Sequence, residues 1–321
     1  MDSAQQPARP RNLRAVCRDA CLNDDLEAFK QAMAEAPGHQ SRFPAQDLLA
    51  GSLDLCLRHR SPKILTALLD DYGVDVAKAS PRIIGAGDDG DDLENRGPPY
   101  AILDILIAHG WDINTRGSDS LDVPLLWRAT SNAEFVDWCL SHGASVNILG
   151  ETPIRDARGV GPVERETVLE SAARDGSPET FEKLRARGAP TGQRTLHKAV
   201  LQAIHTALKP GERDHVAFDE RLDMVRHLVS EVKLDPNAYC GMVGMPAGSP
   251  LYTVATYPNG RDTRRLIWLL LDRGADPDLP GPTVENESIT PSPMVAAERE
   301  GNKVFLEAVK EWRARQSASE K

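Results

Sequence analysis

The apolar positions of this chain fall into short, helix-periodic stretches, and many of these stretches end in the same way. The segment 109–114 (HGWDIN) returns 33 residues later as 142–147 (HGASVN) and again as 273–278 (RGADPD), with a shorter form at 187–190. In each copy a Gly follows the last apolar turn, where φ > 0 closes the helix. His or Arg before the Gly suits the negative end of the helix dipole, and Asp or Asn after it suits a tight turn. This repeated ending predicts a stack of similar small units.

A second pattern precedes these helix ends. Residues 167–176 predict a short helix with small residues on one side, followed by a turn and a second helix, capped by Ser177 with Pro178 at its first position. Each unit is therefore predicted to be two short helices joined by a tight turn. The same layout recurs at 249–274, 195–199 and 292–306.

The spacing and the segment Leu196-His197-Lys198-Ala199 resemble the ankyrin repeat, which has a period of about 33 residues and the signature Thr-Pro-Leu-His-x-Ala. Elsewhere Leu126, Glu170 and Tyr252 stand at the place of the signature His. The resemblance implies an all-α fold, an ankyrin-like helix-turn-helix solenoid of about seven to eight repeats with long finger-loop insertions. It also implies that the His197 ring hydrogen-bonds to neighbouring turns.

The repeats predict one continuous array over 12–315, with a disordered N-terminus at 1–11 and a disordered tail at 316–321. Residues 305–315 are predicted to form a polar-faced cap. The clearest units end at Gly143, Gly188 and Gly274, and a weaker unit lies at about 66–114. Two more units precede it, one from Leu13 to Met33 with a break at 23–25, and one from Asp47 to Gly73 with a break at Ser61-Pro62.

Most residues in excess of the period fall between a helix-ending Gly and the next inner helix, at 150–165, 239–249 and 279–292. The resemblance places these insertions in finger-like turns that border the concave groove of the array, a position that often binds partners. Met242 and Met245 either offer mobile apolar contact surface or fill the stack below them. Two other insertions, at 85–99 and 209–219, are expected to separate an inner helix from its outer helix.

Composition and charge narrow the range of partners. The net charge of −10 disfavours nucleic-acid binding, which needs cationic side chains against the phosphates. Arg261, Arg264 and Arg265 form the densest basic patch, which is either a solvated helix face or a contact for an acidic partner. No apolar stretch is long enough to span a membrane, and the N-terminus lacks the apolar core of a secretory signal. We therefore expect a monomer in the cytoplasm or nucleus that binds neither nucleic acid nor membranes.

The search for chemistry gives no catalytic motif, and no cofactor or metal is expected. The five cysteines lack metal-type spacing, and Cys17 and Cys21 are expected to be a buried pair of thiols in a reducing compartment. The acidic segment 85–94 lacks the spacing of a calcium loop, and its G-x-G-x-x-G has no surrounding βαβ unit. His205 and His215 flank an insertion and are the weakest of the candidates, as an acid–base or metal pair.

We therefore expect a protein–protein interaction module that binds a partner through its concave groove and finger loops, with aromatic and Arg side chains as anchors. Trp111 is the leading anchor, because Ala is usual at that position; alternatively Trp111 and Trp127 pack on each other. A second hypothesis is a groove that has become a small-molecule or catalytic pocket, and a third is a dimerising scaffold. The predicted partner-binding residues are Trp111, Asp112, Asn114, Arg116, Trp127, Arg128, Asn147, Glu151, Tyr239, Met242, Tyr252, Asp276 and Asp278.

Overall fold

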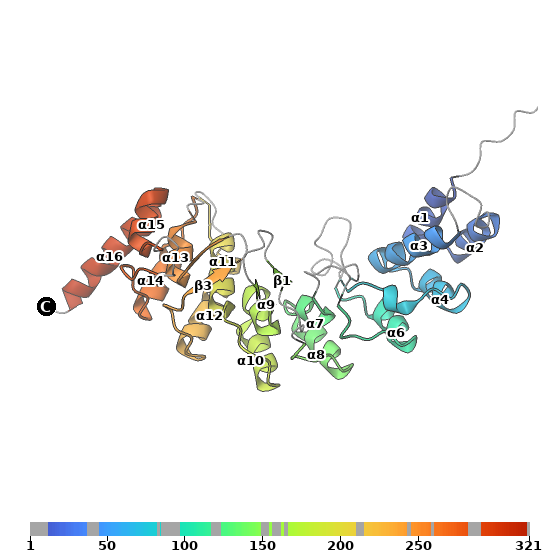
Figure 1. The fold of residues 1–321 in the computed structure, drawn as a ribbon, viewed down its shortest axis with the longest axis horizontal. Coiled ribbons are helices and arrows are strands. Elements are labelled where there is room, and N and C mark those ends of the chain that lie inside the picture. Colours follow the sequence, from blue (N-terminus) through green and yellow to red (C-terminus); the bar gives the residue numbers. More distant parts are fainter. Residues whose placement is uncertain are drawn as a thin grey trace, which may run out of the picture. The chain divides into compact units, whose positions relative to one another are not determined.

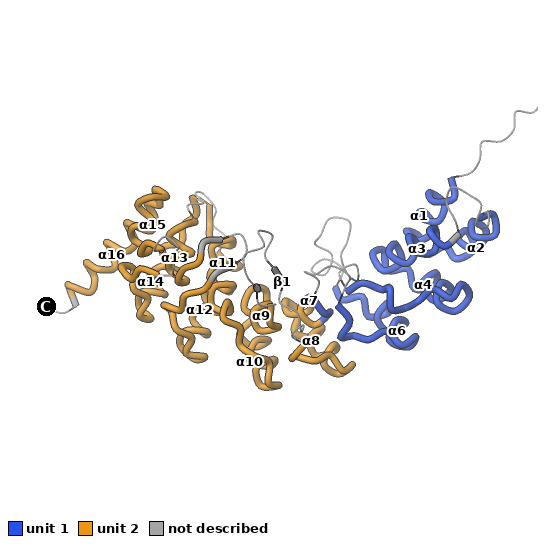
Figure 2. Tube along the Cα trace, viewed as in Figure 1, with its two compact units in different colours: residues 1–125 blue, residues 126–321 orange. Residues whose placement is uncertain are grey.

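The structure of this chain, a computed structural model, is mostly α-helical in the residues that it describes (Figure 1). This confirms the predicted all-α class, and the described strands are limited to two short antiparallel pairs. The helices form two compact units, residues 1–125 and 126–321 (Figure 2). The described residues are 12–36, 45–81, 84, 97–116, 123–148, 154–155, 162–163, 166–209, 215–242, 245–257, 260–281 and 290–319.

The described part of the first unit contains two helix pairs and a further helix. The first pair is α1 (Leu13–Asn23) with α2 (Leu26–Glu35), and the second is α3 (Ala45–His59) with α4 (Pro62–Asp70). Helix α1 also packs against α3, and α2 against α4, so the pairs are stacked. A 3-10 turn, η1 (Val76–Lys78), follows, and α6 (Tyr100–Ala108) packs against α4. The predicted breaks at 23–25 and at Ser61-Pro62 are confirmed.

The second unit repeats this arrangement. Helix α9 packs against α10 and α11, α11 against α12 and α13, and α13 against α14 and α15, so each pair contacts the next. On the other side α10 contacts α12, and α14 contacts α16. The helices are α7 (Leu125–Arg128), α8 (Ala133–Ser141), α9 (Val168–Asp175), α10 (Pro178–Ala186), α11 (Thr195–Thr206), α12 (Val216–Ser230), α13 (Pro250–Ala255), α14 (Arg264–Asp272), α15 (Pro293–Glu300) and α16 (Lys303–Ser319).

Two of the predicted insertions contain short hairpins. Strand β1 (Ile154–Arg155) pairs with β2 (Pro162–Val163), with Ile154 opposite Val163. Strand β3 (Cys240–Met242) pairs with β4 (Met245–Gly248), with Cys240 opposite Gly248. Both hairpins stand between the end of one helix pair and the start of the next.

The repeated glycines end their helices as predicted. Gly110, Gly143, Gly188 and Gly274 have φ of 86°, 86°, 84° and 92°. In each case the next residue's N–H bonds back to the helix, for example Ala144 N to Cys139 O at 3.0 Å. This is the hydrogen-bonding pattern of a left-handed helix end, which leaves few carbonyls without donors.

The polar residue two positions after such a helix end closes a second turn. Its side chain accepts a hydrogen bond from the backbone N–H two residues later, as Asp112 does from Asn114 at 2.9 Å and Asp276 from Asp278 at 2.8 Å. Ser145 plays this part in the copy at 142–147. Each copy therefore turns sharply away from its helix, because the side chain supplies the acceptor.

One copy of this helix end escaped the sequence reading. Lys233 has φ of 65° at the end of α12, and Leu234 N bonds to Leu228 O at 3.0 Å. Asp235 then accepts from Asn237 N, as in the other copies. The sequence pattern did not identify this helix end, because Lys stands where the other copies have Gly. At the other end of the chain, α16 continues to Ser319, so residues 316–319 are helical where the sequence predicted a disordered tail.

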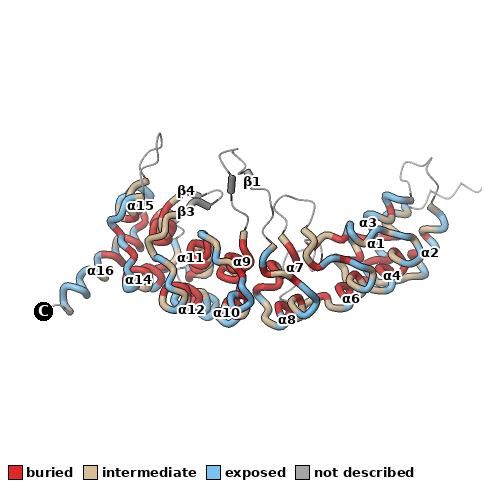
Figure 3. Tube along the Cα trace, turned by 60° about the horizontal axis from the view of Figure 1, so that its bottom comes forward, coloured by how far each residue is buried: buried red, intermediate tan, exposed pale blue. Residues whose placement is uncertain are grey.

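The core lies between the packed helices (Figure 3). The second helix of a pair commonly buries a Phe on its first turn or just after it. Phe29 of α2, Phe135 of α8, Phe181 of α10 and Phe305 of α16 are at most 1% exposed. Since a buried Phe side chain contributes about 2–3 kcal/mol, these rings fix which face each helix turns inward.

Candidate functional site

A small cleft lies in the second unit between the β3–β4 hairpin and the segments 279–281 and 290–291. Its volume is about 70 Å³. Two of the three predicted finger insertions, 239–249 and 279–292, thus contribute to one site; residues 282–289 lie outside the described part. Its lining consists of Asn237, Tyr239, Gly248, Ser249, Tyr252, Leu279, Pro280, Gly281, Thr290 and Pro291. We call it the finger cleft.

Glycines let two tyrosine rings form the walls of the finger cleft. A Cβ on Gly281 would lie 2.5 Å from Tyr239 Cε2, and one on Gly248 would lie 2.2 Å from Tyr252 Cδ1. No real side chain tolerates such contacts, so both rings lie directly against backbone. The Tyr239 hydroxyl hydrogen-bonds to the Thr290 hydroxyl at 2.7 Å, which joins the two segments across the cleft.

The described lining residues of the cleft include no ionised side chain. Burial, with a smaller contribution from the neighbouring Tyr239, raises the pKa of Tyr252 above its usual value. The Tyr252 phenol therefore remains protonated at neutral pH. Apolar surface with hydroxyl and backbone groups at its edges suits an apolar side chain of a partner.

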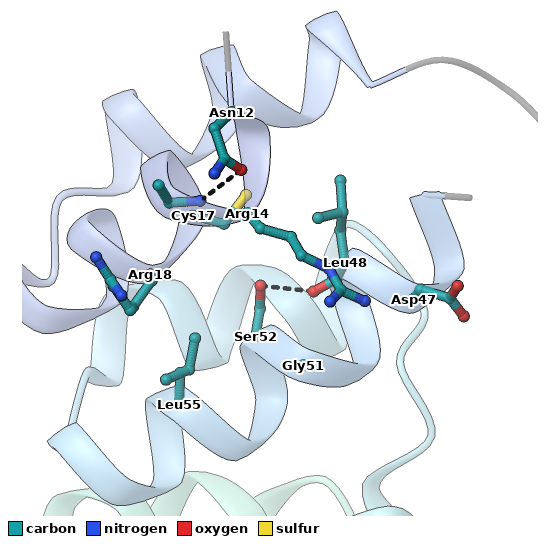
Figure 4. A pocket seen from close by; sticks show the side chains of 10 residues that line it. Asn12, Arg14, Cys17, Arg18, Asp47, Leu48, Gly51, Ser52 and Leu55 are labelled. Atoms are coloured by element: carbon teal, nitrogen blue, oxygen red, sulfur yellow. Dashed lines mark hydrogen bonds between the residues drawn. The ribbon is translucent and has the colours of Figure 1, made fainter. Parts of the chain in front are cut away.

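A larger cavity, of about 390 Å³, lies between α1 and α3 in the first unit (Figure 4). Cys17, Leu48 and Ser52 form its floor and are at most 4% exposed. Figure 4 shows Arg14 extending from α1 toward Leu48 of α3, with Arg18 one turn further along α1. We call this cavity the α1–α3 groove.

Two predicted anchors lie in the core, which corrects their expected role. Trp111 is 4% exposed, and its indole N–H donates to Ala79 O at 3.1 Å. Trp127 is 2% exposed, and its indole N–H donates to Glu166 O at 2.8 Å. A ring so enclosed leaves almost no surface for a partner, so both tryptophans belong to the packing of their own units.

The predicted polar contacts divide by what they do. Asp112 and Asp276 close the turns described above, and the side chains of Asn147 and Asp278 are exposed at the same turns. The Asp276 backbone N–H also donates to Asn237 Oδ1 at 2.8 Å, which places this turn at the edge of the finger cleft. The exposed side chains of these turns can therefore contact a partner in addition to stabilising the turns.

The remaining predicted residues are placed as follows. Tyr239 is half-buried and Tyr252 is 7% exposed; the structure brings these two together at the finger cleft. Asn114, Arg116 and Arg128 are half-buried and do not line either cavity. Glu151 and the side chain of Met242 lie outside the described residues.

The sequence reading missed a buried ion pair. Glu170 is 1% exposed and holds the Arg194 guanidinium at 3.0 Å and the Arg194 backbone N–H at 2.9 Å. It also completes a capping box with Thr167 at the start of α9. The available signal was Glu170 at the place of the signature His, where a charged residue inside an apolar helix face must have a partner.

His197, the residue that keeps the signature, does what the resemblance implied. The ring is 1% exposed, and its Nε2 donates to Gly248 O at 2.9 Å. Burial is the main cause that lowers the pKa of His197, so the ring is neutral at neutral pH. Gly248 ends β4, and His197 thereby fixes the base of the β3–β4 hairpin.

The basic patch on α14 is engaged with carboxylates. Arg264 pairs with Glu307 and Glu311 of α16, at 3.6 and 3.3 Å, and Arg265 pairs with Asp219 of α12. On α16, the Arg315 guanidinium lies 4.1 Å from the centre of the Trp268 ring. These contacts support the solvated, structural interpretation of the patch and the role of α16 as a polar-faced cap.

Evidence for chemistry is slight in the part of the chain that is described. Within it, no group of three or more His, Cys, Asp and Glu side chains is placed to hold a metal ion. His205 bonds to the Tyr257 hydroxyl at 3.1 Å, whereas His215 is the residue directly before α12, and the two do not form a pair. The acidic segment 88–94 falls outside the described residues.

The buried thiols are confirmed, with an addition. Cys17 and Cys21 are 2% and 0% exposed, and Cys56 of α3 donates to Cys21 Sγ at 3.6 Å. Burial raises the pKa of Cys17 to about 11, which leaves its thiol protonated and unreactive at neutral pH. These thiols fill the contact between α1 and α3.

None of the described helices combines the length and apolar character that a membrane crossing requires. No protein-family model and no curated protein matches this chain. A solved structure of the Bd0816 predatory endopeptidase from Bdellovibrio bacteriovorus in complex with immunity protein Bd3460 contains a similar chain. The match covers 66% of this chain and 91% of that chain at 17% identity, with a TM-score of 0.37. A likeness this low carries no argument about function.

Proposed function

We propose that this chain is an ankyrin-type repeat protein that binds a protein partner through the finger cleft. Three observations support the repeat type: stacked helix pairs, helix ends at left-handed glycines, and His197 bonded to the start of the next unit. Each unit of such an array contacts its neighbours, and the connecting loops carry the binding residues.

The size of the finger cleft is the observation that carries the proposal. Sites that enclose a small molecule usually measure about 300–1,000 Å³. At about 70 Å³ the finger cleft has room for one side chain rather than a metabolite. A cleft of this size between two loops, with tyrosine walls, fits the insertion of one apolar side chain from a protein surface.

The rim of the cleft adds surface around that side chain. Leu279 is 45% exposed, one of the few large apolar side chains among the described residues to be so open. Pro280 and Pro291 lie beside it and present rigid apolar surface. Exposed Asp276 and Asp278 directly precede this segment, and Asp278 also pairs with Arg313 of α16. A partner with a basic rim gains electrostatic attraction to Asp276.

The test is a comparison of three full-length baits in cross-linking affinity capture with quantitative mass spectrometry: wild type, Leu279→Asp and Val216→Asp. Val216 is the matched control, since it is a 64% exposed apolar residue on α12 that lines neither described cavity. We expect a defined set of proteins to be captured by wild type and Val216→Asp and reduced at least tenfold on Leu279→Asp. Identical capture by all three baits refutes the finger cleft as the binding site.

A further inference from the structure

The α1–α3 groove exists because the residues that line it in its middle have small side chains or none. On α3, Gly51 lies on the wall of the cavity, and Ser52 turns its hydroxyl back to Leu48 O at 2.7 Å. On α1 the facing residue is Ala15. The two helices therefore touch at the buried thiols below and separate above them.

Gly51 has no internal reason to be glycine. Its φ is not in the left-handed region, and a Cβ added there would meet no described atom within 4 Å. Gly in the interior of a 15-residue helix destabilises that helix relative to Ala. Gly51 lowers the stability of its helix, and neither the backbone conformation nor the packing requires glycine there. This indicates that the space above Gly51 accommodates a group from outside the chain.

The charges around the groove restrict its occupant. Arg14 and Arg18 lie one turn apart on α1, and Asp47 lies in the first turn of α3. Among the described residues, the Arg18 guanidinium pairs with the neighbouring Asp19, at 3.4 Å, with both side chains about 60% exposed. An exposed pair of this kind contributes little, so a carboxylate from outside replaces Asp19 at small cost.

The apolar surface of the groove supplies the second half of the recognition. Leu48 is 4% exposed at the floor, and Leu55 is half-buried two turns further along α3. An aliphatic side chain placed over Gly51 contacts both leucines, while a neighbouring carboxylate lies beside the arginines. Asp47 lies at the other end of the groove from Arg18 and repels a second carboxylate there, which sets the direction of the occupant (Figure 4).

We propose that the α1–α3 groove binds a segment of a protein partner that carries one Asp or Glu beside an apolar side chain. The inference deepens the proposed function, on which it rests, by adding a second contact of stated chemistry in the first unit. Its volume of about 390 Å³ accommodates several residues of such a segment.

The experiment is selection from a random 12-residue peptide library displayed on phage, with the full-length chain as bait. The decisive variant is Gly51→Met, because an added Cβ there meets no described atom within 4 Å and the rest of the side chain extends into the groove. Its matched control is Ala50→Met, on an exposed neighbouring position of α3 that does not line the groove. Thermal unfolding followed by circular dichroism checks that both variants fold as the wild type does. Arg18→Glu is the third variant, because it reverses one charge.

We expect wild type and Ala50→Met to enrich peptides that carry Asp or Glu next to an aliphatic or aromatic residue, and Gly51→Met to lose this enrichment at least tenfold. On Arg18→Glu the acidic preference should disappear. Enriched peptides that survive Gly51→Met, that lack acidic residues, or that are absent from the wild-type selection altogether overturn the inference. Peptides lost on Leu279→Asp yet kept on Gly51→Met overturn it while leaving the finger cleft as the binding site.

Discussion

The buried pair of Glu170 and Arg194 allows a prediction whose size follows from its contacts. The Glu170 carboxylate accepts from Thr167 N at 3.1 Å and from three nitrogens of Arg194, and the Arg194 side chain is only 11% exposed. Glu170→Ala leaves that guanidinium without its carboxylate, so we expect the free energy of unfolding to fall by about 3–5 kcal/mol. Arg194→Ala should cost less, about 1–3 kcal/mol, because the two backbone N–H groups still satisfy the carboxylate.

The assay is a double-mutant cycle by urea titration, with hydrogen exchange of the 167–175 segment as a local readout. We expect a coupling energy of about 1–3 kcal/mol between Glu170 and Arg194. The matched control is Lys183 with Asp137, which lie 2.7 Å apart but more exposed, and whose coupling should stay below about 1 kcal/mol. A coupling for the buried pair no larger than that of the control would refute the reasoning, since burial would then add nothing.

Three further predictions address the repeat itself. Lys233→Gly should raise the free energy of unfolding by about 0.5–1 kcal/mol, because φ of 65° strains a residue with a side chain. The reverse change Gly73→Lys, at φ of 62°, should lower the free energy of unfolding by a similar amount. Urea midpoints equal to that of the wild type for both variants would count against backbone strain. Burial lowers the pKa of His197 below its usual 6.5, so the unfolded chain binds a proton that the folded chain does not. Stability should therefore fall as the pH drops below about 6.5, and His197→Gln should flatten this part of the pH profile; an unchanged slope speaks against it. Trp111→Ala should cost about 3–5 kcal/mol in urea titrations while leaving peptide selection unchanged, and a stable variant with lost binding would return Trp111 to the surface.

The helix ends were predictable because local rules fix them. A Gly after an apolar turn predicts a left-handed residue, and the structure confirms this at Gly110, Gly143, Gly188 and Gly274. The same reasoning failed at Lys233, where the chain adopts the conformation without the residue that favours it. A pattern that depends on residue type finds only those copies in which the sequence follows the low-energy choice.

The orientation of the large aromatic side chains was not predictable from the sequence. Trp111 faces the core because its indole N–H reaches Ala79 O, an acceptor 32 residues away that periodicity does not reveal. The α1–α3 groove escaped for the opposite reason, since it depends on side chains that Gly51 and Ala15 do not supply. The position of the finger cleft was closer to prediction, because both segments that form it were identified as insertions between helix pairs.

The residues at the position where the ankyrin-type signature has His also explain how long insertions are tolerated. In successive units Glu170 contacts Arg194, the residue before α11, and His197 contacts Gly248, two residues before α13. Both side chains thus hold the end of a connecting segment where it returns to the helices, although 51 residues separate His197 from Gly248. The Tyr252 ring lies directly against Gly248. Because the end of the connecting segment is fixed, the rest of the loop tolerates changes in length and composition without disturbing the packing of the helix pairs. Loops attached in this way present contact residues at low entropic cost. Glu170 and His197 are therefore different side chains that do the same thing, because each fixes the end of a connecting segment next to the following helix pair.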